Sequence, residues 1–255
     1  ITGPFNLSVN QECGMLVEGF ETPPALMMPH GRNWYERLLM DQGYSKVKDL
    51  LAYWVDVDFE APKVMLSLIG RYGSRVRLRT LRHDRLDEDL EILRDIFNDA
   101  WSENWAFVPL SKAEFAEFGA SLRLIVPDDY VQIAEIEGEP VAFIAALPNI
   151  NEILADLNGR LLPFGWLRLL WRLKRQQVST GRVPLMGVRK RYQNTPLGMA
   201  LAFLVIDAVR HALLSRGIKE VEMSWILEDN SGMRSILDSI GSTLYKRYRL
   251  FEKSL

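Results

Sequence analysis

The spacing of apolar residues in the last third of the chain predicts alternating strands and helices. Apolar positions recur every three or four residues over Pro196–Ser215, which predicts a helix that ends before Gly217. Short apolar or alternating runs on either side predict strands, and Met233, Ile236, Leu237 and Ile240 mark one face of a further helix. The predicted order is a strand at Arg182–Val188, the long helix, a strand at Val221–Leu227, a helix at Asn230–Ile240 and a strand at Thr243–Phe251. This order indicates an α/β protein.

Similar patterns extend upstream. They predict a strand at Arg75–Leu81, a helix from Leu86 or Asp87 to Ala100, a helix at Ser111–Leu122, and strands at Val131–Glu137 and Pro140–Leu147 joined by a hairpin turn at Gly138. Residues 148–181 then separate this hairpin from the next strand and form an insertion. Within the insertion, residues 161–175 mix Trp and Leu with Arg and Lys, which predicts an amphipathic helix. It would be a substrate lid, an acyl-chain wall or a peripheral membrane contact, or simply a helix docked on the domain with its basic face in water.

The first 60 residues partly repeat the C-terminal pattern. We expect a short strand within residues 1–10, a helix at Trp34–Met40 and a strand at Ser45–Val55, followed by a connector with a short helical piece at Val64–Ile69. Aligning Gly43 with Gly241, an offset of 241 minus 43, or 198, pairs the helix–Gly–strand segments. The sequence therefore predicts a partial first unit (1–60), a connector (61–74) and a complete second unit (75–255). The alternative is that a helix followed by a glycine and a strand is a common succession in any α/β chain and indicates no repeat.

Composition excludes several kinds of protein. The formal net charge of the 255 residues is -2, and no basic region indicates nucleic-acid binding. The single cysteine, Cys13, excludes an internal disulfide and a cysteine-based zinc site, and the three histidines have no metal-like spacing. We expect no metal and a reducing, cytoplasmic location. We expect no membrane span, because no apolar run approaches the roughly 20 residues that one needs.

The turn before the long helix has the features of an anion site. Arg189, Lys190 and Arg191 precede a helix N-terminus, where backbone amides lack partners and the helix dipole is positive. The next residues are Gln193, Asn194, Thr195, Pro196, Leu197 and Gly198. This run resembles the phosphate-binding segment of the GNAT superfamily of N-acyltransferases. The usual pattern of that segment is Gln or Arg, two residues, Gly, one residue, then Gly or Ala. Here Pro196 stands in place of the middle glycine. The downstream elements follow the GNAT order, with Asn230 and Gly241 at the expected separation.

The resemblance implies a mixed, mainly antiparallel GNAT sheet flanked by helices, and acetyl-CoA or another acyl-CoA as the donor. Pantetheine would run along Leu185–Val188, where Gly187 allows close approach, although Gly187 is equally explained as a bulge glycine. The pyrophosphate would lie on the helix N-terminus, although three exposed basic residues are usually just solvated. The implied cofactor-binding residues are Gly187, Val188, Arg189, Gln193, Asn194, Thr195, Leu197, Gly198, Met199 and Asn230. Asn230 is equally a favoured helix N-cap.

Proton-handling residues are harder to assign. Many members of the superfamily have a Tyr seven positions after the Asn that corresponds to Asn230. In this chain that position is Leu237. We expect Glu228, beside Asp229, to be the general base and Tyr245 or Tyr248 to replace the missing acid. The alternatives are an ordinary loop carboxylate and ordinary core aromatics.

The resemblance implies direct transfer of an acetyl or longer acyl group from acyl-CoA to a small-molecule or peptide amine. Trp101, Trp105 and Phe107 are candidates to line the acceptor site, or packing residues. Two other functions stay open. Pro196 and Leu237 favour a GNAT-fold binding module without catalysis, and the apolar insertion favours a transferase that uses an aminoacyl or acyl-carrier donor.

Overall fold

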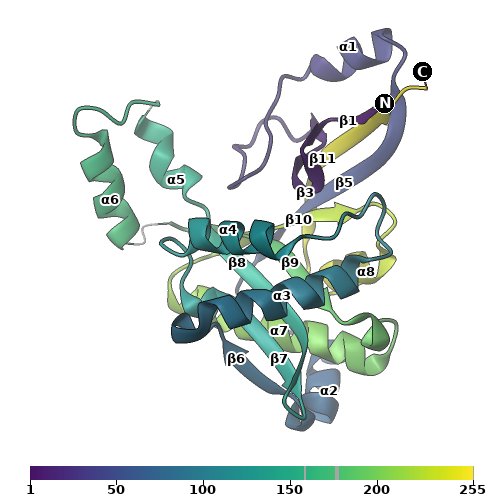
Figure 1. Ribbon diagram of the computed structural model, residues 1–255, viewed down its shortest axis with the longest axis vertical. Coiled ribbons are helices and arrows are strands. Elements are labelled where there is room, and N and C mark those ends of the chain that lie inside the picture. The colour runs from purple at the N-terminus through teal and green to yellow at the C-terminus, as the bar shows by residue number, and fades with distance from the viewer. Residues whose placement is uncertain (158, 176–177, 255) are drawn as a thin grey trace.

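A single mixed sheet organises the protein. The computed structural model describes residues 1–157, 159–175 and 178–254. In spatial order the strands are β1 (Thr2–Gly3), β11 (Thr243–Glu252), β5 (Ser45–Asp56), β10 (Glu220–Leu227), β9 (Thr180–Val188), β8 (Glu139–Pro148), β7 (Val131–Ile136) and β6 (Arg77–Thr80), with β4 (Met15–Glu18) also paired to β11. Only β9 and β10 are parallel among these nine strands, so the predicted mixed, mainly antiparallel fold class is confirmed (Figure 1).

Helices cover both faces of the sheet (Figure 1). One face packs on α7 (Pro196–Ser215) and α2 (Lys63–Tyr72), and the other packs on α3 (Leu86–Trp101) and α4 (Lys112–Leu122). Helix α7 is long and apolar enough to cross a bilayer by length and composition, contrary to the expectation from the sequence. Ten of its residues are buried in the core, however, which explains its apolar composition equally well.

The N-terminal segment covers the remaining part of the second face. The predicted single strand within residues 1–10 was wrong, because Leu7 has a φ of 73° and the chain reverses there. Two short strands result, β2 (Phe5–Asn6) and β3 (Ser8–Cys13), which pair with each other. Residues between Cys13 and Met28 then pack on Leu50, Tyr248 and Leu250, next to Trp105 from the loop after α3. The second face therefore has two covers, which meet along a seam.

Strand β5 connects the predicted first unit to the second. It follows α1 (Tyr35–Asp41) and lies between β10 and β11 as a central strand. The repeat alignment equates Leu50 with Tyr248, and these two residues are direct partners across β5 and β11. The neighbouring pairs, Asp49 with Arg249 and Leu51 with Arg247, are symmetric about them. This two-fold arrangement supports the predicted repeat, which stays a prediction.

Other elements follow the predictions closely, because their ends carry local signals. Asn230 caps α8 (Ser231–Ser239), Ser111 caps α4 in a capping box, and Thr195 caps α7. The insertion contains α5 (Asn151–Leu154) and α6 (Gly165–Arg175), which project away from the sheet (Figure 1).

A buried ion cluster joins the first turn of α3 to β6. The Asp89 carboxylate is fully buried and accepts hydrogen bonds from Arg79 at 3.0 Å and Arg82 at 2.7 Å. Burial raises the pKa of Asp89, but the bonds from Arg82 and Arg79 outweigh this and hold the pKa below its ordinary value. This stabilisation is therefore complete above the unfolded pKa of about 3.9 and is lost as the pH falls through the folded value.

We expect Asp89→Asn to lower the free energy of unfolding by about 3 kcal/mol at pH 7, because it removes the buried carboxylate shared by Arg79 and Arg82 and leaves them only their second partners, Glu135 and Glu88. Urea denaturation measures this effect, and the difference from wild type should shrink below pH 4. Asp87→Asn, in the same turn but exposed, is the matched control. Equal losses in both variants would contradict the assignment.

Candidate active site

The parallel pair β9 and β10 separates halfway along its length. Backbone pairing runs from Thr180 and Glu220 to Val183 and Met223 and then stops. Pro184, the next residue of β9, has no N–H to continue the ladder. Beyond this point each strand keeps its outer neighbour, β8 or β5, so an opening forms in the middle of the sheet.

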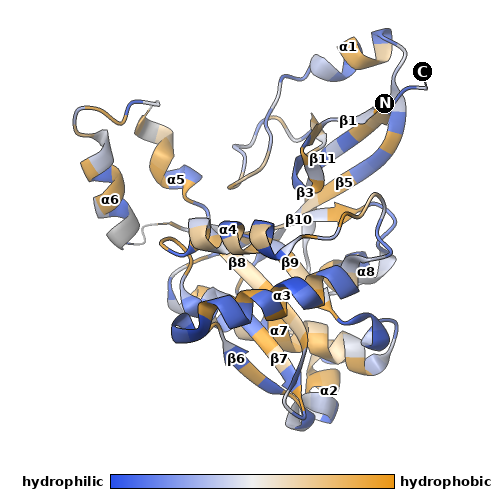
Figure 2. Ribbon diagram, viewed as in Figure 1, coloured by the Kyte–Doolittle hydropathy of each residue, from blue (hydrophilic) through white to orange (hydrophobic). Residues whose placement is uncertain are grey.

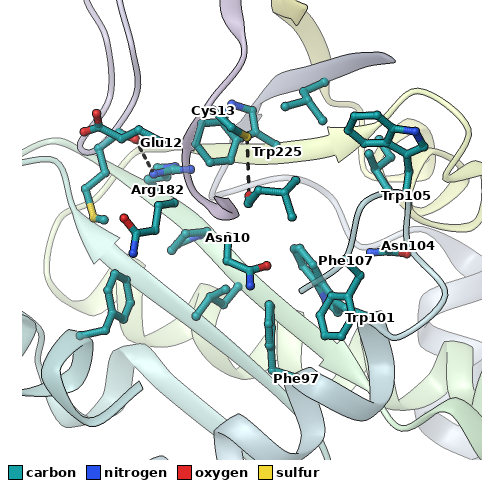
Figure 3. Close-up of a pocket in the computed structure, with 18 residues that line it drawn as sticks. Asn10, Glu12, Cys13, Phe97, Trp101, Asn104, Trp105, Phe107, Arg182 and Trp225 are labelled. Carbon is teal, nitrogen blue, oxygen red and sulfur yellow. Dashed lines mark hydrogen bonds between the residues drawn. The ribbon is translucent and has the colours of Figure 1, made fainter. Parts of the chain in front are cut away.

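A cavity of about 70 Å³, here called the first cavity, lies over this opening at the seam between the two covers. Phe97, Trp101 and Phe107 face it from one cover, and Cys13, Arg182 and Trp225 lie on the other side (Figure 3). Its lining is mostly apolar and aromatic. It also includes Val9, Asn10, Gln11, Glu12, Met27, Leu50, Asn104, Trp105, Phe118, Pro184, Leu185 and Leu227. Trp101, Trp105 and Phe107, the predicted acceptor-site aromatics, are thus all part of its wall.

Arg182 is the buried cation of this wall. Its Nε donates to Ser224 Oγ at 3.0 Å and lies 3.6 Å from Glu222 Oε1, and its Nη1 donates to the Leu26 carbonyl at 2.8 Å. Burial lowers the pKa of Arg182, and the Glu222 carboxylate opposes that effect. The guanidinium is therefore held rigidly by strand β10 and by the N-terminal cover.

Two hydroxyl groups complete the hydrogen bonding of the Glu222 carboxylate. Both Ser224 Oγ and the Tyr245 hydroxyl donate to its carboxylate, which is fully buried behind Arg182. Burial, together with the negative charge of Glu222, raises the pKa of Tyr245 far above its ordinary value. Tyr245, predicted as a general acid, is thus a partner of Glu222 and is not part of the lining of the first cavity.

Donors around the cavity lack partners. Trp225 Nε1 is enclosed and has no hydrogen bond, and its ring lies 5.0 Å from the Arg182 guanidinium carbon. Arg182 Nη2 makes no hydrogen bond with the described residues, and it is not one of the enclosed atoms without a partner. We conclude that Nη2 is open to the cavity. An oxygen atom with negative charge in the cavity would satisfy the Nη2 donor, whereas the enclosed Trp225 Nε1 is closed to a ligand.

The predicted phosphate-binding turn wraps the N-terminus of α7. Thr195 Oγ1 accepts from the Gly198 amide at 3.0 Å, and Asn194 adopts a positive φ of 58°. A Cβ on Gly198 would lie 2.0 Å from the Tyr192 carbonyl oxygen, so only glycine fits there. The amides of Asn194, Thr195 and Leu197 have no hydrogen-bond acceptor among the described residues. Three free donors at a helix N-terminus fit a phosphate group.

Acidic residues neutralise the basic part of this turn. Arg189 pairs with Asp95 at 2.7 Å, Lys190 with Glu103 at 2.5 Å and Arg191 with Glu139 at 2.5 Å. The exposed Lys190 and Arg191 pairs contribute little stability, whereas Arg189 is mostly buried and also donates to the Pro140 carbonyl. The turn therefore offers a phosphate group its free backbone amides, with the exposed side chains of Lys190 and Arg191 as further cations.

The edge of β9 is already partly bonded. Trp101 Nε1 donates to the Met186 carbonyl at 3.0 Å, and Gln193 Nε2 donates to the Val188 carbonyl at 2.9 Å. A Cβ on Gly187 would lie 3.1 Å from Phe143 and 3.3 Å from Ala100, so this glycine allows α3 to approach the sheet. Pantetheine running along this edge would compete with Trp101 and Gln193.

The other predicted site residues lie beyond the cavity. Glu228 accepts the Asp49 amide at 3.0 Å and Lys46 Nζ at 2.7 Å, which engages both of its oxygens. Asn230 Oδ1 caps the Met233 amide at 3.0 Å. Leu237 is fully buried in the core, so α8 supplies no hydroxyl group at the usual position. Met199 and Leu197 are near the phosphate turn, the first exposed and the second packed on the core.

Sequence reasoning missed Arg182, Glu222 and Glu12. Glu12 is the only carboxylate among the described residues that line the first cavity. An Arg and a Glu at inward positions of two strands, 40 residues apart, carry no local pattern that distinguishes them from surface residues. The one available signal was the placement of a charged residue within each predicted buried strand, which implies a partner.

Solved structures with the same architecture define the class. A GCN5-related N-acetyltransferase from Sphaerobacter thermophilus superposes with a TM-score of 0.55 at 16% identity, covering 90% of this chain and 57% of that one. A tandem GNAT protein from the clavulanic acid pathway gives 0.52 at 14% identity, covering 95% and 64%. No protein-family model matches the chain. The chain therefore has the GNAT fold, including a parallel β9 and β10 pair that divides partway along its length.

Two curated proteins are similar in sequence over the whole chain. Protein YghO of Escherichia coli K12 is 50% identical over 256 residues, and the bacterial ceramide synthase of Caulobacter vibrioides is 43% identical over 254 residues. The chain spans 66% of the length of each.

Proposed function

We propose that this protein transfers an acyl group from a phosphopantetheine thioester to the amine of a long-chain acceptor. The observation that carries this proposal is the apolar first cavity over the divided strands, with the guanidinium of Arg182 at its inner end. Apolar walls suit alkyl chains, and the charged Arg182 guanidinium suits a thioester oxygen that becomes negative during attack.

The reaction would proceed in a ternary complex. The amine nitrogen bonds to the thioester carbon, the carbon–sulfur bond breaks, and an amide and a thiol result. The amine loses one proton and the departing thiolate gains one, so the reaction needs no other reactant. Arg182 would stabilise the tetrahedral oxyanion, while Glu222 and Ser224 position it. Glu12, on the cavity wall, would receive the amine proton; Glu228 stays a prediction for this role.

The phosphate part of the donor would bind at the N-terminus of α7. The free amides of Asn194, Thr195 and Leu197 support this, and they would recognise the phosphate of coenzyme A or of an acyl-carrier prosthetic group alike. Helix α7 thus supports a phosphopantetheine donor without deciding which carrier bears it.

The acceptor assignment draws on the relative named a ceramide synthase. Ceramides are N-acylated long-chain amino alcohols, so such an acceptor has a primary amine and an alkyl chain. The apolar and aromatic wall of the first cavity is compatible with that chemistry.

A transfer assay tests the proposal. The purified chain is incubated with acetyl-CoA, palmitoyl-CoA or palmitoyl carrier protein and with sphinganine, and amide and free thiol are both quantified. Formation of amide and thiol in equal amounts supports transfer. Thiol release without amide, or no reaction of a folded protein with any donor, contradicts it and favours the noncatalytic binding module.

The insertion carries an exposed apolar surface, here called the arm surface. It comprises Leu161, Leu162, Phe164, Trp166, Leu167, Leu170 and Trp171, whose exposed fractions range from 44% to 79%. Arg160, Arg168, Arg172 and Arg175 lie in the same segment, and α6 shows alternating hydrophobic and hydrophilic bands away from the body (Figure 2). Trp and Leu on one side with Arg on the other is typical of helices that lie in a membrane interface. We propose that the arm surface contacts an anionic lipid surface, where a long-chain acceptor would partition.

Leu162→Ser combined with Phe164→Ser should reduce binding to vesicles that contain phosphatidylglycerol by at least tenfold, because both side chains would be buried among lipids. Co-sedimentation measures the bound fraction. Leu124→Ser removes an equally exposed leucine outside the arm and is the control. Absence of binding between the wild-type protein and anionic vesicles would contradict the proposal.

The repeat origin of residues 1–60, the division at 61–74 and a cytoplasmic location remain predictions. Co-sedimentation from a cell lysate and an alignment of the symmetric β5 and β11 segments across relatives would test them.

A further inference from the structure

A second cavity of about 70 Å³ lies next to the first, beneath α4. Its walls come from α3, α4 and strands β7, β8 and β9. They include the apolar side chains of Leu86, Leu90, Leu93, Phe115, Leu122 and Val126. Nothing in the mechanism proposed above uses this space.

The two cavities share part of their walls. Phe118, Pro184 and Leu185 line both of them. Pro184 and Leu185 belong to the part of β9 that has left β10, so the shared wall starts beside Arg182. The partly buried ring of Phe118, from α4, is the one side chain of the three that is both large and carried by a covering helix.

The far end of the second cavity reaches the surface. Its polar lining residues are His83, Arg123 and Asp128. His83 contacts Arg123 at 3.0 Å and Asp128 at 3.5 Å, and all three side chains are partly or largely exposed. The path therefore has a charged centre at one end, water at the other, and apolar side chains between.

We propose that the two cavities form one channel for a single long alkyl chain of the substrate, with Phe118 at its narrowest point and α4 as its lid. This inference rests on the proposed function and adds a binding site to it. A linear chain fits because the path from the shared wall to His83 is apolar and its end is open, so a polar group in that part would meet no side-chain hydrogen-bond partner. The chain belongs either to the acyl group or to the amine, and the test separates the two.

Gly119 provides the means to close the channel. It lines the second cavity, and a Cβ there would lie 2.6 Å from both Leu90 methyl groups. Leu90 lines the same cavity, so Gly119→Leu would fill the space by pushing a flexible side chain into it. Leucine also favours a helix more than glycine does, so α4 should persist. Ala120→Leu, exposed at the next position of α4, is the matched control.

The experiment measures kcat/KM in two series. In one, acyl-CoA of two to sixteen carbons reacts with a short amine; in the other, acetyl-CoA reacts with amines of increasing chain length. In the series that uses the channel, wild type should gain roughly fourfold per buried methylene until a plateau. Gly119→Leu should move that plateau to shorter chains and change the rate with the shortest substrate less than twofold. Phe118→Ala should move it to longer chains, and Ala120→Leu should match wild type.

A chain-length profile of Gly119→Leu that matches wild type in both series would overturn the channel. Absence of any transfer by wild type would count against the proposed function instead. In that case binding of a fluorescent undecanoic acid probe tests the channel alone: Gly119→Leu should weaken it at least tenfold, and unchanged or undetectable binding in wild type and variant would overturn the inference.

Discussion

Replacing Arg182 and Glu222 together, as Arg182→Met and Glu222→Gln, is expected to lower kcat for acyl transfer by roughly 10²–10³ in a protein that still folds. The double variant removes both charges, so neither remains buried without a partner. The cavity keeps its apolar walls but loses the Nη2 donor that faces it. Steady-state kinetics should therefore show a large change in kcat and a small change in KM.

The control for this variant is Lys246→Met. Lys246 is as buried as Arg182 and likewise donates to loop carbonyls, at Thr22 and Pro23, but it does not line the first cavity. It should cost stability without a comparable loss of kcat. If Lys246→Met and the double variant lose kcat equally, Arg182 has only a structural role.

Gly198→Val is expected to raise KM for acyl-CoA by at least tenfold. Its Cβ would lie 2.0 Å from the Tyr192 carbonyl oxygen, a backbone atom that cannot yield without moving the turn. That movement would displace the free amides of Asn194 and Thr195 from their positions at the helix N-terminus. Each lost hydrogen bond to a charged phosphate costs about 1.5–3 kcal/mol, which is a tenfold or larger change in affinity.

A shortened donor makes this test specific. An acyl-N-acetylcysteamine thioester has the reacting group and part of the pantetheine arm but no phosphate. Gly198→Val should leave kcat/KM for that donor within about threefold, and His211→Ala, exposed near the other end of α7, should change kcat/KM for neither donor. Equal losses with both donors would indicate a damaged fold and remove the phosphate assignment.

Local patterns were sufficient for most elements of the second unit. Helix α7 has the predicted bounds, and Asn230 caps α8 as its side chain implied. These features depend on neighbours within four residues, whose spacing and capping groups are written in the sequence. The N-terminal residues deviated because the positive φ of Leu7, a residue type that rarely adopts it, has no sequence signal.

The family resemblance predicted a phosphate turn and a general base, and both stay predictions. It drew attention to Glu228 at the end of β10, whose oxygens are engaged by Asp49 and Lys46. Glu222 lies earlier in the same strand, β10. It faces Arg182 across the β9 and β10 pair. A motif identifies equivalent positions along two chains. The pairing of buried charges depends instead on which strands become neighbours in the sheet.

The sequence by itself determined the alternation of strands and helices and the caps that bound several of the helices. Only the tertiary structure decided that β5 enters the sheet between β10 and β11, that β9 and β10 part after Val183, and that two covers meet above the opening. The reason is physical: periodicity and capping are set by contacts a few residues apart. Strand order and cavities arise from packing between segments far apart in the chain, such as Thr2 and Glu252, whose partners no single segment specifies.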